Sequence, residues 1–181
     1  MRLYFMQMSN ESISTKKPKI EVHFDNIVDA IVKYIKCYDL IKVCCAWFTC
    51  PLIIEALGER DSEVIVGSTE FLTKGHPEYR EKLASELIMS LGKGNVRVCV
   101  RDKITKLTEV VDEGIVHNKF MIFYKYEDSK PVPCAVITGS YNYTVTARNN
   151  KENIIYVEDK LVAEAYDNDY AKIRLKTKAL T

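Results

Sequence analysis

The order of apolar and polar residues along the chain predicts short strands separated by helices. Runs of β-branched, aromatic and other apolar residues, bounded by polar or glycine-containing segments, are typical of strands. Leu40–Phe48 is apolar except for Lys42, which indicates a strand buried on both faces in the middle of a sheet. The other predicted strands lie at residues 20–24, 63–67, 96–100, 116–124, 132–138 and 153–157.

Four of the intervening segments show the three-to-four-residue apolar spacing of an amphipathic helix. They cover residues 26–35, 49–58, 77–91 and 161–173, and Asp25 is placed to cap the first of them. The second helix is expected to turn four side chains inward: Leu52, Ile53, Ala56 and Leu57. Strands that alternate with helices predict the α/β class, here an α/β sandwich in which helices flank a mixed central β-sheet.

Length and composition indicate one globular domain. The chain has 181 residues, and domains typically run to about 100–200 residues. Residues 1–18 are polar and carry several lysines, so we expect a flexible N-terminal tail followed by a single domain at residues 19–181. A net charge of +1 gives no overall attraction to nucleic acid, so contacts with DNA would have to come from local basic patches.

The six cysteines and the apolar segments argue against zinc sites, membrane spans and secretion. No two cysteines have the Cys-x-x-Cys spacing, and most lie in apolar runs where a free thiol behaves as a small hydrophobe. No segment approaches the roughly 20 apolar residues of a membrane span, and no signal peptide is visible. A reducing, cytoplasmic location is therefore expected.

The chemistry of the chain concentrates in residues 116–153. His117 and Lys119 lie two residues apart in a predicted strand, so their side chains share one face. An imidazole beside an ammonium suits a phosphate group, because the lysine can hold an oxygen while the histidine attacks phosphorus or transfers a proton.

Polar residues downstream extend this pattern. Gly139 permits close approach of the backbone, and Ser140 and Asn142 supply donors for phosphate oxygens. The residues from 143 to 148 are expected to begin a helix whose N-terminus favours an anion. Glu152, on a predicted strand with Asn150, is placed to fix the tautomer of an imidazole by accepting its Nδ1 proton.

Together, His117-x-Lys119, Gly139-Ser140-x-Asn142 and Asn150-x-Glu152 resemble the signature of the phospholipase D superfamily, and in particular its small single-motif bacterial endonucleases. The likeness covers most of Lys19–Ile173. It implies a phospholipase D-like fold and cleavage of phosphodiesters through a phosphohistidine intermediate. It also implies that two motifs form one active site, in which Lys119, Ser140 and Asn142 bind phosphate.

One departure from the superfamily pattern concerns the seventh residue after the histidine. That position usually holds Asp and here holds Tyr124. On ideal strand alternation Tyr124 faces away from His117 and Lys119, so we interpret its presence as a structural change rather than a catalytic one. The segment Lys125–Pro131 predicts an extended hairpin turn.

A covalent histidine mechanism needs a second imidazole as general acid and base. The sequence has no internal repeat, and neither His23 nor His76 has a lysine two residues on. The expectation is therefore a homodimer that brings two His117 side chains to one site. Two lysines would neutralise the phosphate charge, so no cofactor or metal is expected, and no acidic cluster of a two-metal nuclease is visible.

The motifs favour a metal-independent phosphodiesterase, and the resemblance to the small endonucleases implies in the first place an endonuclease with DNA as its partner. Two alternatives stay open: a phospholipase of the same superfamily, and a catalytically silent nucleic-acid-binding module. Each residue also has an ordinary structural interpretation, with His117 a structural histidine, Lys119 an edge charge, Asn142 a helix cap and Glu152 a solvated strand residue. Trp47 and Phe48 are interpreted as core, His23 as structural, and a basic set mainly as a solvated face: Arg97, Arg101, Lys103 and Lys106.

Overall fold

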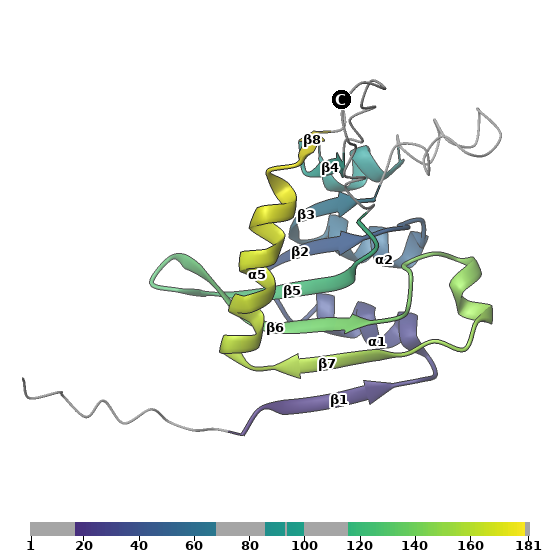
Figure 1. Ribbon diagram of the computed structural model, residues 1–181, viewed down its shortest axis with the longest axis horizontal. Helices are drawn as coiled ribbons and strands as arrows, with labels where there is room; N and C mark the ends of the chain where they lie inside the picture. The colour runs from purple at the N-terminus through teal and green to yellow at the C-terminus, as the bar shows by residue number, and fades with distance from the viewer. Residues whose placement is uncertain (1–16, 68–85, 93, 100–115, 180–181) are drawn as a thin grey trace, which may run out of the picture.

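One mixed β-sheet organises the part of the chain that the computed structural model describes, namely residues 17–67, 86–92, 94–99 and 116–179. Its eight strands follow the order β1-β7-β6-β5-β2-β3-β4-β8 (Figure 1). The strands are β1 (Lys19–His23), β2 (Leu40–Cys45), β3 (Asp61–Val66), β4 (Val96–Cys99), β5 (Lys119–Glu127), β6 (Lys130–Gly139), β7 (Ile154–Glu158) and β8 (Thr177–Ala179). The predicted α/β sandwich is confirmed.

Helices cover both faces of the sheet. Helices α1 (Ile27–Ile35) and α2 (Pro51–Gly58) lie on one face, and α5 (Lys160–Arg174) crosses the other (Figure 1). The side chains of β5 divide between the two layers as strand alternation requires. Met121 and Phe123 join the core under α1 and α2, while Phe120, Ile122 and Tyr124 join the core under α5.

Strand β2 occupies the middle of the sheet, as its apolar sequence predicts. It pairs in parallel with β3 and antiparallel with β5. Ile41, Val43 and Cys45 are fully buried on the α1–α2 side and Cys44 is fully buried on the α5 side. A strand with a strand on each side and a helical layer over each face offers little surface to water, which explains why the run carries one charge, the partly exposed Lys42.

The hairpin between β5 and β6 is tighter than the sequence indicates. The strands pair as far as Glu127 and Lys130, which leaves a two-residue turn. Asp128 and Ser129 have φ of 49° and 63°, the left-handed conformation that a type I′ turn requires at both central residues. The seven residues expected to form a long turn therefore belong largely to the strands.

Three details of the elements differ from the sequence prediction. The N-cap of α1 is Asn26 rather than Asp25, and its side chain makes no capping hydrogen bond. Leu52 is 45% exposed instead of inward, whereas the other three predicted side chains of α2 are buried. Strand β8 was not predicted. The 77–91 helix is described from residue 86 and is helical to 91, while its first nine residues and the tail at 1–16 lie outside the described residues.

Candidate active site

The motif residues converge at one edge of the sheet because of the strand directions. Strand β6 ends there at Gly139, while the neighbouring antiparallel strands β5 and β7 begin there at Lys119 and Ile154. Strand β2, antiparallel to β5, also ends at this edge with Cys45. In Figure 1 this is the edge toward which the arrows of β2 and β6 point. The segments before β5, after β6 and before β7 therefore bring their polar residues to the same edge of the sheet.

His117 and Lys119 contact each other directly. Lys119 is 8% exposed and is the first residue of β5, while the exposed His117 lies just before the strand rather than inside it, which corrects the predicted start. The Lys119 Nζ lies 2.9 Å from His117 Nδ1, 3.1 Å from Nε2 and 2.6 Å from the His117 carbonyl oxygen. An ammonium only donates, so in this contact a ring nitrogen is the acceptor.

The surroundings of Lys119 influence its charge. Burial lowers the pKa of Lys119 below its usual 10.5, and this effect exceeds the opposing attraction of the Cys45 sulfur and the Glu152 carboxylate. A partly desolvated ammonium attracts an incoming anion more strongly than one in water. The pair at the start of β5 can therefore bind one oxygen of a phosphate beside an accessible imidazole.

Trp47 completes this pair and was missed by the sequence analysis, which interpreted it as core. Its ring meets the His117 ring edge-on, with centroids 5.3 Å apart and planes at 89°. The Lys119 Nζ lies 5.7 Å from the centroid of the same ring. Strand pairing explains the placement, because Cys45 is opposite Lys119 and two steps further on brings residue 47 opposite residue 117. Phe48 is core, as predicted, at 2% exposed.

Ser140 is held in a clamp between the end of β6 and the residues before β7. Its backbone N donates to the Asn153 carbonyl oxygen at 3.2 Å, and its Oγ donates to Asn153 Oδ1 at 3.2 Å. The Asn153 backbone N in turn donates to Ser140 Oγ at 3.2 Å. A Cβ at Gly139 would lie 2.2 Å from the Asn153 oxygen, so glycine is required for this close approach. The exposed hydroxyl is thus fixed at the site edge.

Asn142 carries unused hydrogen-bonding capacity. Its buried Oδ1 has no hydrogen-bond partner among the described residues, whereas its carbonyl oxygen accepts from Thr144 N at 2.7 Å. The two ends of an amide are interchangeable by rotation, so either a donor or an acceptor can be presented to a ligand here. A buried polar atom of this kind is costly unless a ligand satisfies it.

The helix expected after Asn142 does not form as predicted. The chain makes only the short 3-10 helix η1 (Thr146–Asn149), too short to act as a helix N-terminus for an anion. Tyr143 instead bridges to Phe48, and its carbonyl oxygen accepts from Thr49 N at 2.8 Å and Cys50 N at 2.9 Å. This bridge ties the segment after β6 to the start of α2.

Glu152 lies near the pair but does not contact the histidine in this structure. It sits on an extended segment before β7, not on a strand, and its Oε1 accepts from Asn150 Nδ2 at 3.4 Å. Its described influence on the pair is the electrostatic attraction to Lys119. Its role in fixing the imidazole tautomer therefore stays a prediction.

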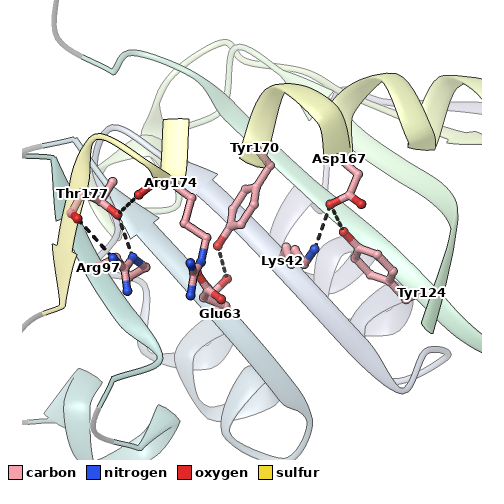
Figure 2. A network of polar contacts seen from close by, with 8 residues as sticks. All are labelled: Lys42, Glu63, Arg97, Tyr124, Asp167, Tyr170, Arg174 and Thr177. Carbon is pink, nitrogen blue, oxygen red and sulfur yellow. Dashed lines mark hydrogen bonds and ion pairs between the residues drawn. The ribbon is translucent and has the colours of Figure 1, made fainter. Parts of the chain in front are cut away.

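Tyr124 lies on the opposite face of β5, as strand alternation predicts. Its hydroxyl donates to Asp167 Oδ1 of α5, and Lys42 Nζ donates to the same oxygen at 2.8 Å (Figure 2). Burial, followed by the hydrogen bond to Asp167, raises the pKa of Tyr124. Tyr124 therefore directs its hydroxyl to a carboxylate of α5, on the side of the sheet away from His117.

The remaining candidates are structural or undescribed. Arg97 donates from Nε to Thr177 Oγ1 at 2.7 Å and joins β4 to β8 (Figure 2), while Arg101, Lys103 and Lys106 lie outside the described residues. His23 Nε2 lies 3.2 Å from the Tyr34 hydroxyl on the α1 side. Within the described ranges, no group of three or more His, Cys, Asp or Glu side chains is arranged to hold a metal ion.

Comparison with known proteins identifies the family. The family model described as "Cardiolipin synthase, PLD-like domain" matches residues 31–174. The chain belongs to the phospholipase D-like family. The resemblance carried by the motifs is thereby confirmed, and the chain is a phosphodiesterase-like member of the phospholipase D superfamily.

Relatives of this phospholipase D-like chain differ in how much they share with it. It is 26% identical over 200 residues to "Uncharacterized protein L381" of Acanthamoeba polyphaga mimivirus, covering 93% of this chain and 69% of that protein. "Phospholipase D" of Rickettsia prowazekii is 46% identical over 54 residues, which is 29% of this chain and 22% of the relative. The match thus spans about a fifth of the rickettsial protein's length.

Solved structures share the phospholipase D-like fold. The phospholipase D family member Nuc from Salmonella typhimurium aligns with a TM-score of 0.68 at 17% identity, covering 91% of this chain and 99% of that one. NucT from Helicobacter pylori aligns with a TM-score of 0.65 at 16% identity, covering 91% and 100%. At these identities the likeness concerns the fold. Among the described helices, none has the length and hydropathy that a membrane span requires.

Proposed function

We propose that this chain is a metal-independent phosphodiesterase, an endonuclease that hydrolyses DNA through a phosphohistidine intermediate at a site shared by two subunits. The observation that carries the proposal is the contact between Lys119 Nζ and the exposed His117 ring at an open edge of the sheet. In a phospholipase D-like fold, this pair has the two groups that phosphoryl transfer to nitrogen needs: a nucleophile and an oxygen-binding cation.

The proposed reaction has two displacements at phosphorus. A ring nitrogen of one His117 forms a bond to phosphorus as the bond to the leaving ester oxygen breaks, and the second His117 gives that oxygen its proton. The second imidazole then removes a proton from water, whose oxygen bonds to phosphorus as the phosphorus–nitrogen bond breaks. Lys119, Ser140 and Asn142 bind the non-bridging oxygens throughout.

The position of the other described histidine supports a second subunit as the source of the second imidazole, while His76 lies outside the described residues. His23 ends β1, and β7 and β6 separate β1 from β5. Three strand spacings amount to about 14 Å, which is too far for both imidazoles to reach one phosphorus atom. A two-fold dimer that faces the site edges toward each other supplies a second His117 instead.

Charge neutralisation in the proposed site comes from Lys119 of each subunit, so a divalent cation has no assigned task. Glu152 is proposed as a positioning residue. When the Lys119 ammonium turns from the His117 ring to the bound phosphate, the Glu152 carboxylate would orient the imidazole. Its electrostatic coupling to Lys119 supports this placement.

A phospholipase is the second candidate, favoured by the local identity with rickettsial phospholipase D. A catalytically silent nucleic-acid-binding module is the third, because Tyr124 stands where the superfamily has Asp. Nicking of supercoiled plasmid against choline release from phosphatidylcholine vesicles separates the first two candidates.

The test of the proposed activity is hydrolysis of bis-p-nitrophenyl phosphate. We expect turnover that persists in excess EDTA, and a loss of at least about 100-fold in the His117→Ala protein. Retained turnover in that variant would remove His117 as the nucleophile, and loss of activity in EDTA would favour a metal mechanism.

A further inference from the structure

A pocket of about 390 Å³ lies beside the candidate site, between the β1–α1 turn, the start of α2 and η1. This β1–α1 pocket is within the volume range of small-ligand sites, which starts at about 300 Å³. It is lined by Phe24, Asp25, Asn26, Ile27, Val28, Asp29, Leu52, Tyr141, Ala147, Arg148, Asn149, Asn150 and Lys151.

Two of the lining residues connect the pocket to the proposed catalytic residues. Tyr141 stands between Ser140 and Asn142 in the chain, and Asn150 donates its side-chain N–H to Glu152. The start of α1 and the segment around η1 lie at the same edge of the sheet as the start of β5 (Figure 1). The pocket and the His117–Lys119 pair therefore lie at the same edge of the sheet, along which a substrate with its phosphate at His117 can extend.

The charges around the pocket select the chemistry of that group. Asp25 and Asp29 contribute carboxylates, and Arg148 and Lys151 contribute cations. The two carboxylates and two cations balance, so the lining has no net positive charge to select a second phosphate, and the number of charged and amide groups disfavours an acyl chain. A nucleobase presents both donors and acceptors at its edge, so it can pair with carboxylates, amides and cations together.

A base site also needs an apolar surface on which the flat face of the base can stack, and Phe24 and Leu52 provide one. Phe24 is 68% exposed and Leu52 is 45% exposed, and both line the pocket. Bases stack on such rings in proteins that bind single strands. The Asn26 amide does not cap α1, so its donor and acceptor are not used at the helix end.

We infer that the β1–α1 pocket binds one unpaired nucleobase of a single-stranded or locally opened nucleic acid, with the base on Phe24 and the neighbouring phosphate at His117. The inference rests on the proposed function and deepens it, because it assigns a nucleic acid with accessible bases as the substrate class. A base held in a duplex is stacked and paired, so it would reach the pocket only after extrusion from the helix.

The test compares oligonucleotide binding with and without bases, in a His117→Ala background that prevents cleavage. Fluorescence anisotropy would be measured for a labelled single-stranded oligodeoxynucleotide and for an abasic chain of equal length. Phe24→Ala is expected to weaken binding of the first about ten-fold and of the second less than about two-fold, as for loss of one stacked base. The matched control is Leu161→Ala on α5, where the side chain is 76% exposed and outside the pocket, and it should match the parent protein with both chains.

Equal losses with both oligonucleotides, or no loss with either, would overturn the pocket inference. Melting of Phe24→Ala close to that of the parent is expected, since the ring is mostly exposed. Hydrolysis of bis-p-nitrophenyl phosphate by the native protein reports separately on the proposed function. If the native protein hydrolyses the ester but Phe24→Ala affects both oligonucleotides alike, the pocket inference alone is rejected. If Phe24→Ala weakens only the base-containing oligonucleotide but the native protein does not hydrolyse the ester, the catalytic proposal alone is rejected.

Discussion

Lys119 illustrates how position in the sheet changes the behaviour of a single side chain. Lys119 is only 8% exposed, yet its Nζ contacts the ring of the exposed His117. Burial disfavours its charged form and lowers its pKa from 10.5. Because the folded pKa is lower than the unfolded value of 10.5, the charge costs stability at neutral pH, and this cost falls as pH rises from the folded pKa and is gone above 10.5. Alkaline pH therefore weakens phosphate binding at Lys119 without unfolding the protein through this group.

This reasoning predicts an alkaline rise in KM for bis-p-nitrophenyl phosphate that begins below pH 10.5 in the native protein. Lys119→Arg is the matched control, since a guanidinium stays protonated throughout that range and should show no such rise. Lys119→Ala should lose about 100-fold in kcat/KM, on the scale of one electrostatic contact to the transition state. A flat KM up to pH 10.5, or the same rise in Lys119→Arg, would contradict the role of the ammonium.

At this scale the sequence predicted the pair but not its neighbours. His117 and Lys119 are two residues apart, so local strand geometry suffices to place them together, and their hydrogen bond confirms it. Trp47 reaches the pair only through the non-local pairing of β2 with β5. Glu152 lies on an irregular segment, and hydrophobic periodicity does not determine the path of such a segment.

At the scale of elements, the contact between β5 and α5 gives Tyr124 a structural role. Tyr124, Asp167 and Lys42 form one polar group under the helix (Figure 2). The Lys42 Nζ also lies 4.7 Å from the centre of the Tyr124 ring. The three residues come from α5 and two adjacent strands, so they fix the position of β5, which begins with Lys119.

Tyr124→Phe is therefore expected to reduce stability by about 1.5–3 kcal/mol, the contribution of a hydrogen bond to a charged group, because the Tyr124 hydroxyl donates to the Asp167 carboxylate. Urea denaturation measures the loss, and kcat/KM should stay within about two-fold of native. Tyr126→Phe on the same strand is the control: Tyr126 is 49% exposed, so the change should cost less than about 0.5 kcal/mol. A large fall in kcat/KM with little loss of stability would assign Tyr124 a catalytic role instead.

The order and type of most elements could be predicted, because they depend on local apolar spacing. The type I′ turn at Asp128 and Ser129 could not, since neither residue is glycine and both adopt positive φ under the constraint of the flanking strands. Strand β8 is three residues long and pairs with β4, so its pattern is too short to recognise in the sequence. The outward Leu52 reflects the pocket beside α2, which only the folded chain creates.

For the whole molecule, the account depends on the meeting of two sheet edges. Within the described residues, each subunit offers His117 at the edge and holds His23 three strands away, so one copy supplies one imidazole to the phosphorus. The proposed dimer makes the two histidines equivalent until a substrate binds, and the direction of the bound strand then decides which one attacks. The β1–α1 pocket of each subunit would lie beside this shared centre.

The most direct test is the turnover of bis-p-nitrophenyl phosphate by a purified mixed dimer with one native and one His117→Ala subunit. Removal of the general acid should lower its activity at least about 100-fold below that of the native dimer. Half of the native activity in the mixed dimer, or full activity of a native protein that sediments as a monomer, would show that each subunit acts alone and would contradict the shared site.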